Sequence, residues 1–476
     1  MDNQLLDFVV LVLYFAVMIG AGYWGLRRAR SADDYLVAGR RLGPFMYIGC
    51  MAAVVLGGAS TIGGVALGYD YGISGMWLVF WIGMGVIALG ILMSSRLSRL
   101  GVYTVSEMLE NRYGAASRLI SAIIIAAYAL MIAVTSTIAI GTVFNVVLPL
   151  SSSVAILVAG GLVVVYSVAG GMWSITLTDI IQFCIMTVGI FFLLVPFSIF
   201  AAGGLSGMQE ALPASYFDLT AIGWQTIFTY FLLFFFGLMI GQDIWQRVFT
   251  ARSPGVARWG SVAAGVYCLL YALAGALVGT AARVILPGIQ SDNAFARITT
   301  EALPVGITGL VLAAALAAVM STASAGLLAS STILANDVYA GFIARGDHNK
   351  VLVNRATTLL VGIVVLVISL IVSDVVGALT VAYDLLSGAL FVPIVGALFW
   401  RRATASGALA SMAAGSVVVV IFMVVDGLFA NTPIIWGMLA SLVVFVVVSL
   451  LTPKPSEERM RTWEQRLTGS GAEGEI

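Results

Sequence analysis

The sequence predicts an all-α polytopic membrane protein, and three observations support this fold class. Of the 476 residues, 61% are hydrophobic and only 10% are charged, whereas a soluble domain carries about 25% charged residues. Apolar runs of about 20 residues, the length that crosses a bilayer as a helix, recur along the whole chain. Basic residues are concentrated in alternate loops between these runs. The surface of the folded chain is therefore expected to face lipid.

The composition also argues against several classes of function. The 23 basic and 23 acidic residues balance, so no net charge attracts nucleic acid. Cys50, Cys184 and Cys268 lie inside apolar runs and are expected to be small buried residues, not disulfide or metal ligands. The single histidine, His348, lies in a polar stretch, so we expect no zinc site or histidine-based triad within the membrane. We therefore expect neither an enzyme nor a bound cofactor.

The apolar runs predict thirteen membrane spans. The first run is longer than the core of a signal peptide, and no small-residue cleavage site follows it, so it is expected to remain as a membrane helix. The predicted spans are residues 5–26, 44–68, 73–95, 119–147, 154–170, 175–201, 222–246, 256–282, 304–336, 352–373, 376–400, 405–425 and 434–451.

The distribution of basic residues predicts the orientation of the chain. An odd number of spans places the two termini on opposite sides of the membrane. If the N-terminus is outside, only Arg283 and Arg297 of the 23 basic residues fall outside, which leaves 21 on the cytoplasmic side. Positive charge is enriched in cytoplasmic loops. The sequence therefore predicts an external N-terminus and a cytoplasmic C-terminus.

Two spans contain signs of an interrupted helix, and interrupted membrane helices mark binding sites because their freed backbone groups must face protein or water. In the second span, glycine pairs flank Ser60 and Thr61 in the segment VLGGASTIGG. Close packing of small residues against another helix is the alternative interpretation. In the seventh span, glycines precede Gln242 and Asp243. The second and seventh spans are separated by five positions in the order of spans. The first helices of two inverted five-helix repeats have the same separation.

The ninth span carries a polar face. Ala318, Ser321 and Thr322 stand at positions i, i+3 and i+4, so they share one side of a helix near its cytoplasmic end. Hydroxyls together with backbone carbonyls are neutral oxygen ligands that suit a hard cation such as sodium. The alternative is that the two hydroxyls bond back to carbonyls of their own helix.

Three carboxylates fall within the predicted spans, where an ionisable residue is functional by default. Asp179 lies near the inner end of the sixth span, either in a polar vestibule with Gln182 or as a capping residue at a helix start. Asp243 precedes Arg247 by four residues, so an ion pair within one helix is an alternative to a site role. Asp384 has no basic neighbour in the sequence, which favours a site role.

Five segments in order resemble the sodium:solute symporter family nearly from end to end: DDYLVAGRRLG, GGMWSITLTDIIQ, QRVFTARS, AAVMSTASAGLLASSTILANDVY and FVPIVGALFWRRA. The resemblance implies a LeuT-type fold and sodium-coupled import of a small polar organic solute by alternating access, in a bacterial inner membrane. It divides the single membrane domain 1–476 into an extra N-terminal helix 5–26, repeats 43–201 and 222–402, two C-terminal helices 405–451 and a cytoplasmic tail 452–476.

The resemblance also implies an ion site. Its sodium ligands are the backbone carbonyls of Ala53 and Leu56 in the second span, together with Ala318, Ser321 and Thr322 in the ninth. The polar face found from helix geometry therefore coincides with the ion site of the family.

Some relatives bind another sodium ion beside the aspartate of the sixth span. Here the corresponding residues are Asp179, Ser321 and Ser324, and Ala325 stands where such relatives have a further serine. The resemblance therefore implies either a second sodium site or an ion-exit route at Asp179 and Ser324.

The solute pocket of the family lies beside the broken second and seventh helices. The residues of this chain expected to line it are Ser60, Thr61, Trp77, Tyr128, Gln242, Asp243 and Asp384. Two carboxylates in one pocket predict a zwitterionic or cationic solute and disfavour a simple carboxylate, because a buried carboxylate needs a cationic partner to stay charged.

Two other classes of function compete with symport. A sensor module of the same fold works without net transport, but such proteins carry long soluble C-terminal domains and the tail 452–476 is short. A passive channel needs an unbroken polar path, which the spans do not offer. The sequence therefore favours a symporter.

Overall fold

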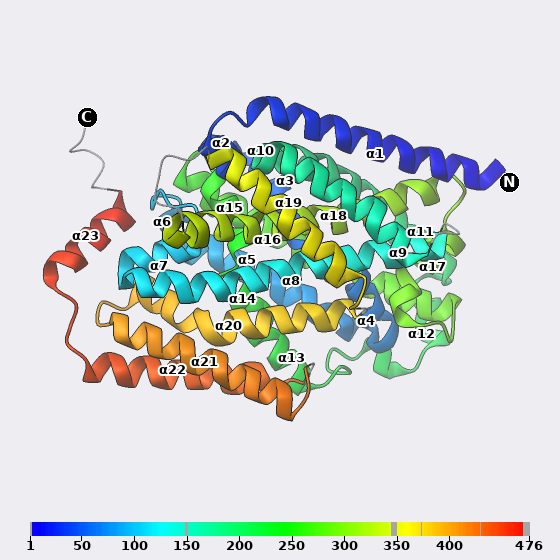
Figure 1. Cartoon of the computed structure of the whole chain (residues 1–476). Helices are drawn as coiled ribbons and strands as arrows, with labels where there is room; N and C mark the ends of the chain where they lie inside the picture. Colours follow the sequence, from blue (N-terminus) through cyan, green and yellow to red (C-terminus); the bar gives the residue numbers. More distant parts are fainter. Residues whose placement is uncertain (1, 148–150, 344–349, 373, 429, 470–476) are drawn as a thin grey trace.

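The computed structural model of the chain describes residues 2–147, 151–343, 350–372, 374–428 and 430–469. Within these ranges every regular element is a helix, and the long helices run side by side in one bundle (Figure 1). His348 lies outside the described residues.

Most of the bundle consists of long apolar helices. In chain order these are α1 (Asp2–Arg28), α5 (Trp77–Leu92), α8 (Ala115–Val147), α10 (Gly161–Met186), α16 (Pro254–Ile285), α18 (Ile307–Ile333), α19 (Lys350–Ser369), α20 (Val375–Phe399), α21 (Ala405–Val425) and α22 (Thr432–Leu451).

Eleven continuous helical stretches of the described chain are long and apolar enough to cross a membrane. Two of these long stretches bend at a glycine with positive φ. One covers 50 residues from Ser152–Ala201 and bends at Gly171, where φ is +53°. The other covers 34 residues from Ala59–Leu92 and bends at Gly72, where φ is +64°. Since about 20 residues suffice for one crossing, these bends are compatible with the thirteen predicted spans, a count that stays a prediction.

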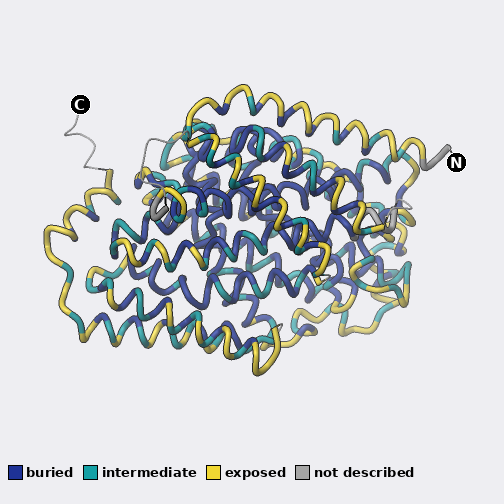
Figure 2. Tube along the Cα trace, viewed as in Figure 1, coloured by how far each residue is buried: buried dark blue, intermediate teal, exposed yellow. Residues whose placement is uncertain are grey.

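The central helix of the bundle is α18. In the stretch Ile307–Ala340, 94% of the most apolar 18-residue segment is buried, against 28% in the stretch Leu5–Arg28 of α1. Figure 2 shows the same contrast, with buried chain through the middle and exposed residues along α1, α21 and α22. Helix α18 packs against α1, α8, α10 and α19. Polar side chains on α18 therefore face protein and not lipid.

Both spans with glycine-rich centres are interrupted, as the sequence predicts. In the first, α3 (Pro44–Val55) stops before a non-helical Leu56 and is followed by a π-helical turn, η2 (Ala59–Gly63), and by α4 (Gly64–Tyr71).

In the second interrupted span, helix α14 (Phe236–Leu238) follows α13 (Trp224–Tyr230) and the π-helical turn η7 (Phe231–Phe235). Helix α15 (Gln242–Thr250) begins after an extended Gly241. The two breaks release backbone groups in the interior of the bundle.

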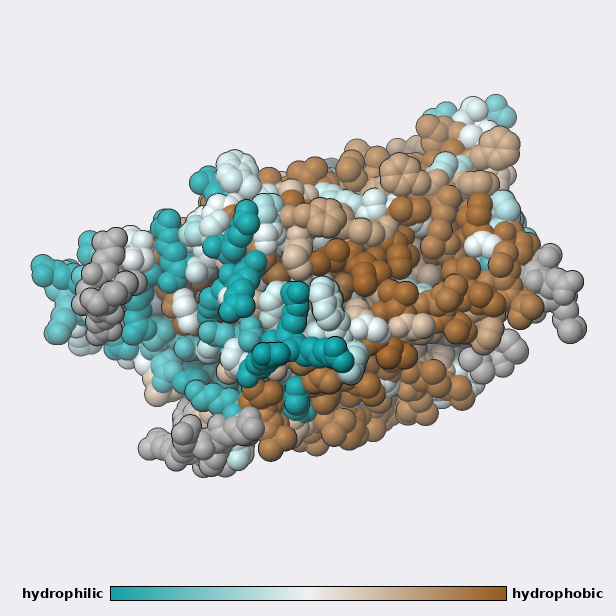
Figure 3. All heavy atoms as spheres, turned by 90° about the horizontal axis from the view of Figure 1, so that it is seen from above, coloured by the Kyte–Doolittle hydropathy of each residue, from teal (hydrophilic) through white to brown (hydrophobic). Residues whose placement is uncertain are grey.

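The two ends of the described chain lie at opposite ends of the bundle (Figure 1). Helix α1 begins at one end, and the last helix, α23 (Glu457–Thr468), lies at the other. Figure 3 shows hydrophilic residues gathered at the α23 end and hydrophobic residues over most of the remaining surface of that face. This distribution suits a bundle whose helices cross a bilayer.

Candidate functional site

The break in α3 leaves carbonyls that its own helix cannot satisfy. The last four carbonyls of a helix have no intrahelical donor, and in α3 these belong to residues 52–55. The hydroxyl of Ser321 lies 2.8 Å from the carbonyl oxygen of Ala53, and that of Thr322 donates to Val54 at 2.7 Å. Ser60 donates to Val55 at 3.2 Å. Hydroxyls from α18 and η2 thus satisfy the carbonyls that the break exposes.

The predicted sodium ligands meet at this junction. Ser321 Oγ also lies 2.8 Å from the carbonyl of Ala318, so three of the five predicted residues are joined by hydrogen bonds. The fourth, Thr322, bonds to Val54, next to Ala53. The carbonyl of the fifth, Leu56, accepts from Thr61 at 3.4 Å.

The hydroxyls of α18 therefore do more than bond back to their own helix. Ser321 contacts carbonyls of both α18 and α3, and the bond of Thr322 crosses to α3. Ser324 does bond within α18, to the Ser321 carbonyl at 2.9 Å. The result is a buried junction of α3 and α18 that is rich in neutral oxygens.

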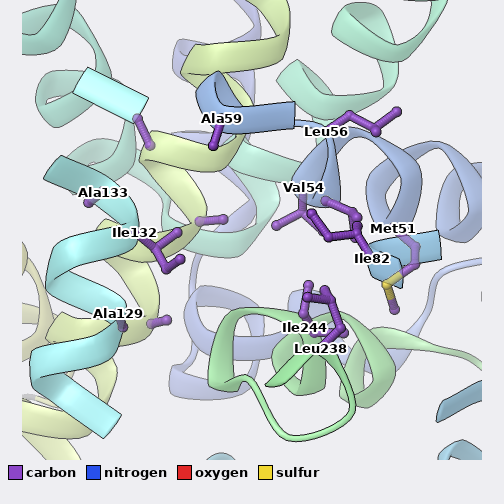
Figure 4. Packing of buried hydrophobic residues seen from close by; sticks show 14 of the residues in the cluster. Met51, Val54, Leu56, Ala59, Ile82, Ala129, Ile132, Ala133, Leu238 and Ile244 are labelled. Atoms are coloured by element: carbon purple, nitrogen blue, oxygen red, sulfur yellow. The ribbon is translucent and has the colours of Figure 1, made fainter. Parts of the chain in front are cut away.

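A small cavity adjoins this junction. Its volume of about 30 Å³ is room for one or two water molecules, whereas pockets that hold drug-sized ligands measure about 300–1,000 Å³. Apolar side chains, among them Val54, Ile82, Ile132, Leu238 and Ile244, form much of its wall (Figure 4). Polar groups of Ser60, Thr135, Ser136, Asp243, Thr322 and Tyr383 also line it. Binding of a solute here therefore requires the surrounding helices to move apart.

Asp243 brings a carboxylate to this cavity from the first turn of α15, where the positive end of the helix dipole favours negative charge. Its side chain accepts a hydrogen bond from the Tyr128 hydroxyl at 3.1 Å, and the Tyr383 hydroxyl lies 3.2 Å from that of Tyr128. The two tyrosine rings meet edge to face, with centroids 5.2 Å apart. Two tyrosines from α8 and α20 thus fix the carboxylate at the edge of the cavity.

Arg247 pairs with Asp179 and not with the side chain of Asp243. Its Nη2 lies 3.1 Å from Asp179 Oδ2, and both side chains are fully buried. Toward Asp243, Arg247 donates only to the backbone carbonyl, at 3.4 Å. The i,i+4 ion pair considered for Asp243 is therefore wrong. The capping alternative for Asp179 is also wrong, because this residue lies inside α10 and not at its start.

Three of the residues predicted to line the solute pocket make other contacts in this structure. The indole of Trp77 donates to the Leu219 carbonyl at 2.7 Å. Gln242 accepts from the Val105 amide at 2.8 Å and so holds the start of α7 (Val105–Tyr113). Thr61 bonds to the Tyr271 hydroxyl at 2.9 Å. None of the three residues lines the cavity.

Asp384 is fully buried, and neither of its carboxylate oxygens has a hydrogen-bond partner in the described part of the chain. It does not line the cavity, but its neighbour Tyr383 does. Neighbouring helical residues point about 100° apart, so a one-residue offset moves a side chain to another face of α20. Tyr383, Thr135 and Ser136 are cavity residues that the sequence motifs did not single out.

The close approach of α3 and α18 yields a prediction about Gly57. A Cβ atom at this position would lie 2.6 Å from Thr322 Oγ1, and crowding of that kind costs about 1–3 kcal/mol. We therefore expect Gly57→Ala to weaken sodium binding by roughly tenfold, measured as the sodium concentration that half-maximally raises the melting temperature.

Gly64→Ala in the same span is the matched control, because its new Cβ would lie 3.4 Å from Val79, an ordinary contact. It should behave like the parent protein. Equal sodium affinity in the Gly57 and Gly64 variants would contradict the placement of sodium at this junction.

Comparison with known proteins gives matches over most of the chain. A model of the sodium:solute symporter family matches residues 35–415. The high-affinity proline transporter PutP of Bacillus subtilis (strain 168) is 29% identical, over 92% of this chain and 97% of that protein. The sodium/glucose cotransporter of Vibrio parahaemolyticus is 26% identical, over 86% of this chain and 83% of that protein.

A solved structure shares the fold. A Na⁺-coupled sialic acid symporter in a substrate-bound outward-open state superposes with a TM-score of 0.82 at 19% identity, covering 95% of this chain and 98% of that one. This likeness confirms the predicted all-helical, LeuT-type fold.

Proposed function

The chain belongs to the sodium:solute symporter family, and from this premise we propose that it imports a small zwitterionic solute together with sodium. The observation that carries the proposal is the break in α3, whose free carbonyls meet the hydroxyls of Ser321 and Thr322. This junction offers several neutral oxygens in a fully buried place, which suits a sodium ion. The chain thus acts as a transporter and not as an enzyme.

In this proposal, sodium is held by the carbonyls of Ala53, Leu56 and Ala318 and by the hydroxyls of Ser321 and Thr322. The hydroxyls turn their lone pairs to the ion instead of donating to carbonyls. Because the ligands come from α3 and α18, a bound ion favours conformations that keep these two helices together. A ligand shifts a conformational equilibrium by its difference in affinity for the two states, and here that difference drives alternating access.

The proposed solute class rests on the groups at the cavity. Asp243 supplies a negative charge for a cationic group of the solute, held in place by Tyr128. The backbone amides freed at the break before η2 lie at the positive end of a helix, where a solute carboxylate is stabilised. A zwitterion satisfies both ends. An amino acid of the proline type is the first candidate, because the Bacillus subtilis relative is a proline transporter.

We propose that one sodium ion moves in each cycle. The resemblance implies either a second sodium or an ion-exit route at Asp179 and Ser324. The Arg247 guanidinium already neutralises Asp179, and Ala325 removes a hydroxyl from the neighbourhood. The arginine thus takes the electrostatic role of a second cation, and Asp179 with Ser324 borders the route by which sodium leaves.

We further propose that the N-terminus is external and the C-terminus cytoplasmic in a bacterial inner membrane. The positions of the two ends at opposite ends of the bundle (Figure 1) and the excess of basic residues on one side support this orientation.

A competition experiment tests the solute class. Proline, choline, a monocarboxylate and a sugar are each tested for protection against thermal unfolding in sodium, and for uptake into proteoliposomes. We expect proline or another zwitterion to protect the parent protein. Asp243→Asn should weaken that protection roughly tenfold or more, because a charge-assisted hydrogen bond contributes about 1.5–3 kcal/mol.

Asp384→Asn is the matched control, since this buried carboxylate does not line the cavity. Its solute affinity should stay within about twofold of the parent value, as is usual for changes away from the contacts. Protection by a monocarboxylate alone, insensitive to Asp243→Asn, would refute the solute class. Binding of a solute without sodium-driven uptake would instead favour the sensor module.

A further inference from the structure

A second cleft lies at the α23 end of the bundle, away from the sodium site. It has a volume of about 280 Å³ and lies between α7, the start of α21 and the start of α23. The described residues that line it include no aspartate or glutamate. Its basic and hydroxyl side chains are Arg112, Lys454, Arg459, Thr404, Ser406, Thr452 and Ser456. The cleft is therefore positively charged.

Two helices begin at this cleft. Thr404 caps α21, which has 21 residues, and Ser456 caps α23, which has 12 residues. Each cap accepts a hydrogen bond from its own first turn, Thr404 from Gly407 at 3.1 Å and Ser456 from Arg459 at 3.3 Å. The N-terminus of a helix carries partial positive charge and backbone amides that attract anions. Two such ends therefore reinforce the charge of the basic side chains.

Arg112 provides an independent sign of a missing anion. Its side chain is 2% exposed, and its Nη2 donates to the backbone carbonyls of Trp400, Arg401 and Ala403 at 3.5, 3.3 and 3.1 Å. Its Nε has no hydrogen-bond partner among the described residues, and no described carboxylate forms an ion pair with it. Burial lowers the pKa of Arg112 below its ordinary value, and the Arg459 charge also lowers it, whereas Tyr113 and Glu464 partly offset this effect. A buried guanidinium without a counter-charge is unfavourable.

The wall formed by α23 is held in place by contacts outside the cleft. The Trp463 indole is buried and donates to the Ala397 carbonyl at the end of α20, at 3.0 Å. Glu464 forms an ion pair with Arg401 at 2.9 Å. The two helix ends and Arg112 therefore stay close together independently of any bound anion.

We propose that this cleft binds a phosphate group, which is contacted by both the tail helix α23 and the membrane domain. Phosphate matches the site because a guanidinium fork and helix N-termini both bind tetrahedral anions through parallel N–H groups. The cleft adjoins the first turn of α21, where a membrane helix begins, so the phosphate comes either from an anionic lipid headgroup or from a soluble phosphate.

The test uses the purified full-length protein in two arms. In the lipid arm, native mass spectrometry measures binding of phosphatidylglycerol and of digalactosyldiacylglycerol, a lipid without phosphate. In the soluble arm, inorganic phosphate replaces chloride at matched ionic strength, and the melting temperature is measured. We expect Arg459→Ala to weaken phosphate-group binding about fivefold, and Lys454→Ala with Arg459→Ala about 25-fold, because each basic residue near an anionic headgroup contributes about 1 kcal/mol.

Arg461→Ala is the matched control, an exposed arginine of the same helix that does not line this cleft. If Arg459→Ala, but not Arg461→Ala, weakens phosphatidylglycerol binding, the phosphate comes from a lipid. If Arg459→Ala, but not Arg461→Ala, reduces the stabilisation by inorganic phosphate, the phosphate is a soluble one. Equal behaviour of the Arg459 and Arg461 variants in both arms overturns the proposal, since it would reduce the effect to general surface charge.

Discussion

Replacing both Ser321 and Thr322 with alanine should raise the sodium concentration for half-maximal uptake by roughly a hundredfold. Each hydroxyl is a neutral oxygen at the junction of α3 and α18, and a polar contact to a charged group contributes about 1.5–3 kcal/mol, or roughly tenfold or more in affinity. The measurement is the sodium dependence of solute uptake into proteoliposomes, with melting temperature as a check on folding.

The control replaces Ser330 and Ser331 on the same helix. These two residues are also buried, and their hydroxyls bond to the carbonyls of Ala126 and Leu328. The control variant should keep the sodium dependence of the parent protein. A Ser321 and Thr322 double variant with unchanged sodium dependence would show that sodium binds elsewhere.

Arg247→Gln should strongly destabilise the protein at low sodium. It leaves Asp179 as a fully buried charge without its partner, and breaking a buried ion pair from one side costs about 3–5 kcal/mol. High sodium should restore much of this stability, because the free carboxylate can recruit a cation in place of the guanidinium. The sodium dependence of the melting temperature and of uptake should then become steeper, with a Hill coefficient rising from about one toward two.

The double variant Asp179→Asn with Arg247→Gln separates the charge effect from a general loss of packing. It removes both charges and keeps a polar group at each position, so its Hill coefficient should return to about one and its stability should exceed that of Arg247→Gln. If Arg247→Gln alone keeps the parent stability and a Hill coefficient of one, the arginine does not act as a substitute cation.

The features that the sequence predicted well depend on local patterns. Long apolar runs give the membrane helices, and glycines beside polar residues give the two breaks. Ser321 and Thr322 could be assigned to one face because the helical repeat fixes the relative direction of residues three and four apart. That face also meets α3, as the family resemblance implied.

The features that sequence analysis missed depend on packing between distant segments. Arg247 has Asp243 four residues away, yet its side chain reaches Asp179 on another helix. Helical spacing shows which neighbours are available but not which of them a tertiary contact prefers. The role of Gln242 at the start of α7 also depends on a contact between distant parts of the chain. For Asp384 and Tyr383, the missing information was the rotation of α20 about its axis.

The hydrogen bonds between α3 and α18 also bear on the return of the unloaded carrier. A symporter must return to its starting conformation without cargo after each delivery. If buried carbonyls had no hydrogen-bond donor at that stage, the free energy of the empty state would rise. Here the oxygens of the proposed sodium site satisfy one another through Ser321 and Thr322. At the proposed site, sodium has to compete with bonds that the protein already makes, and we expect this competition to weaken its binding and speed its release. The same serine and threonine thereby favour rapid turnover over tight capture.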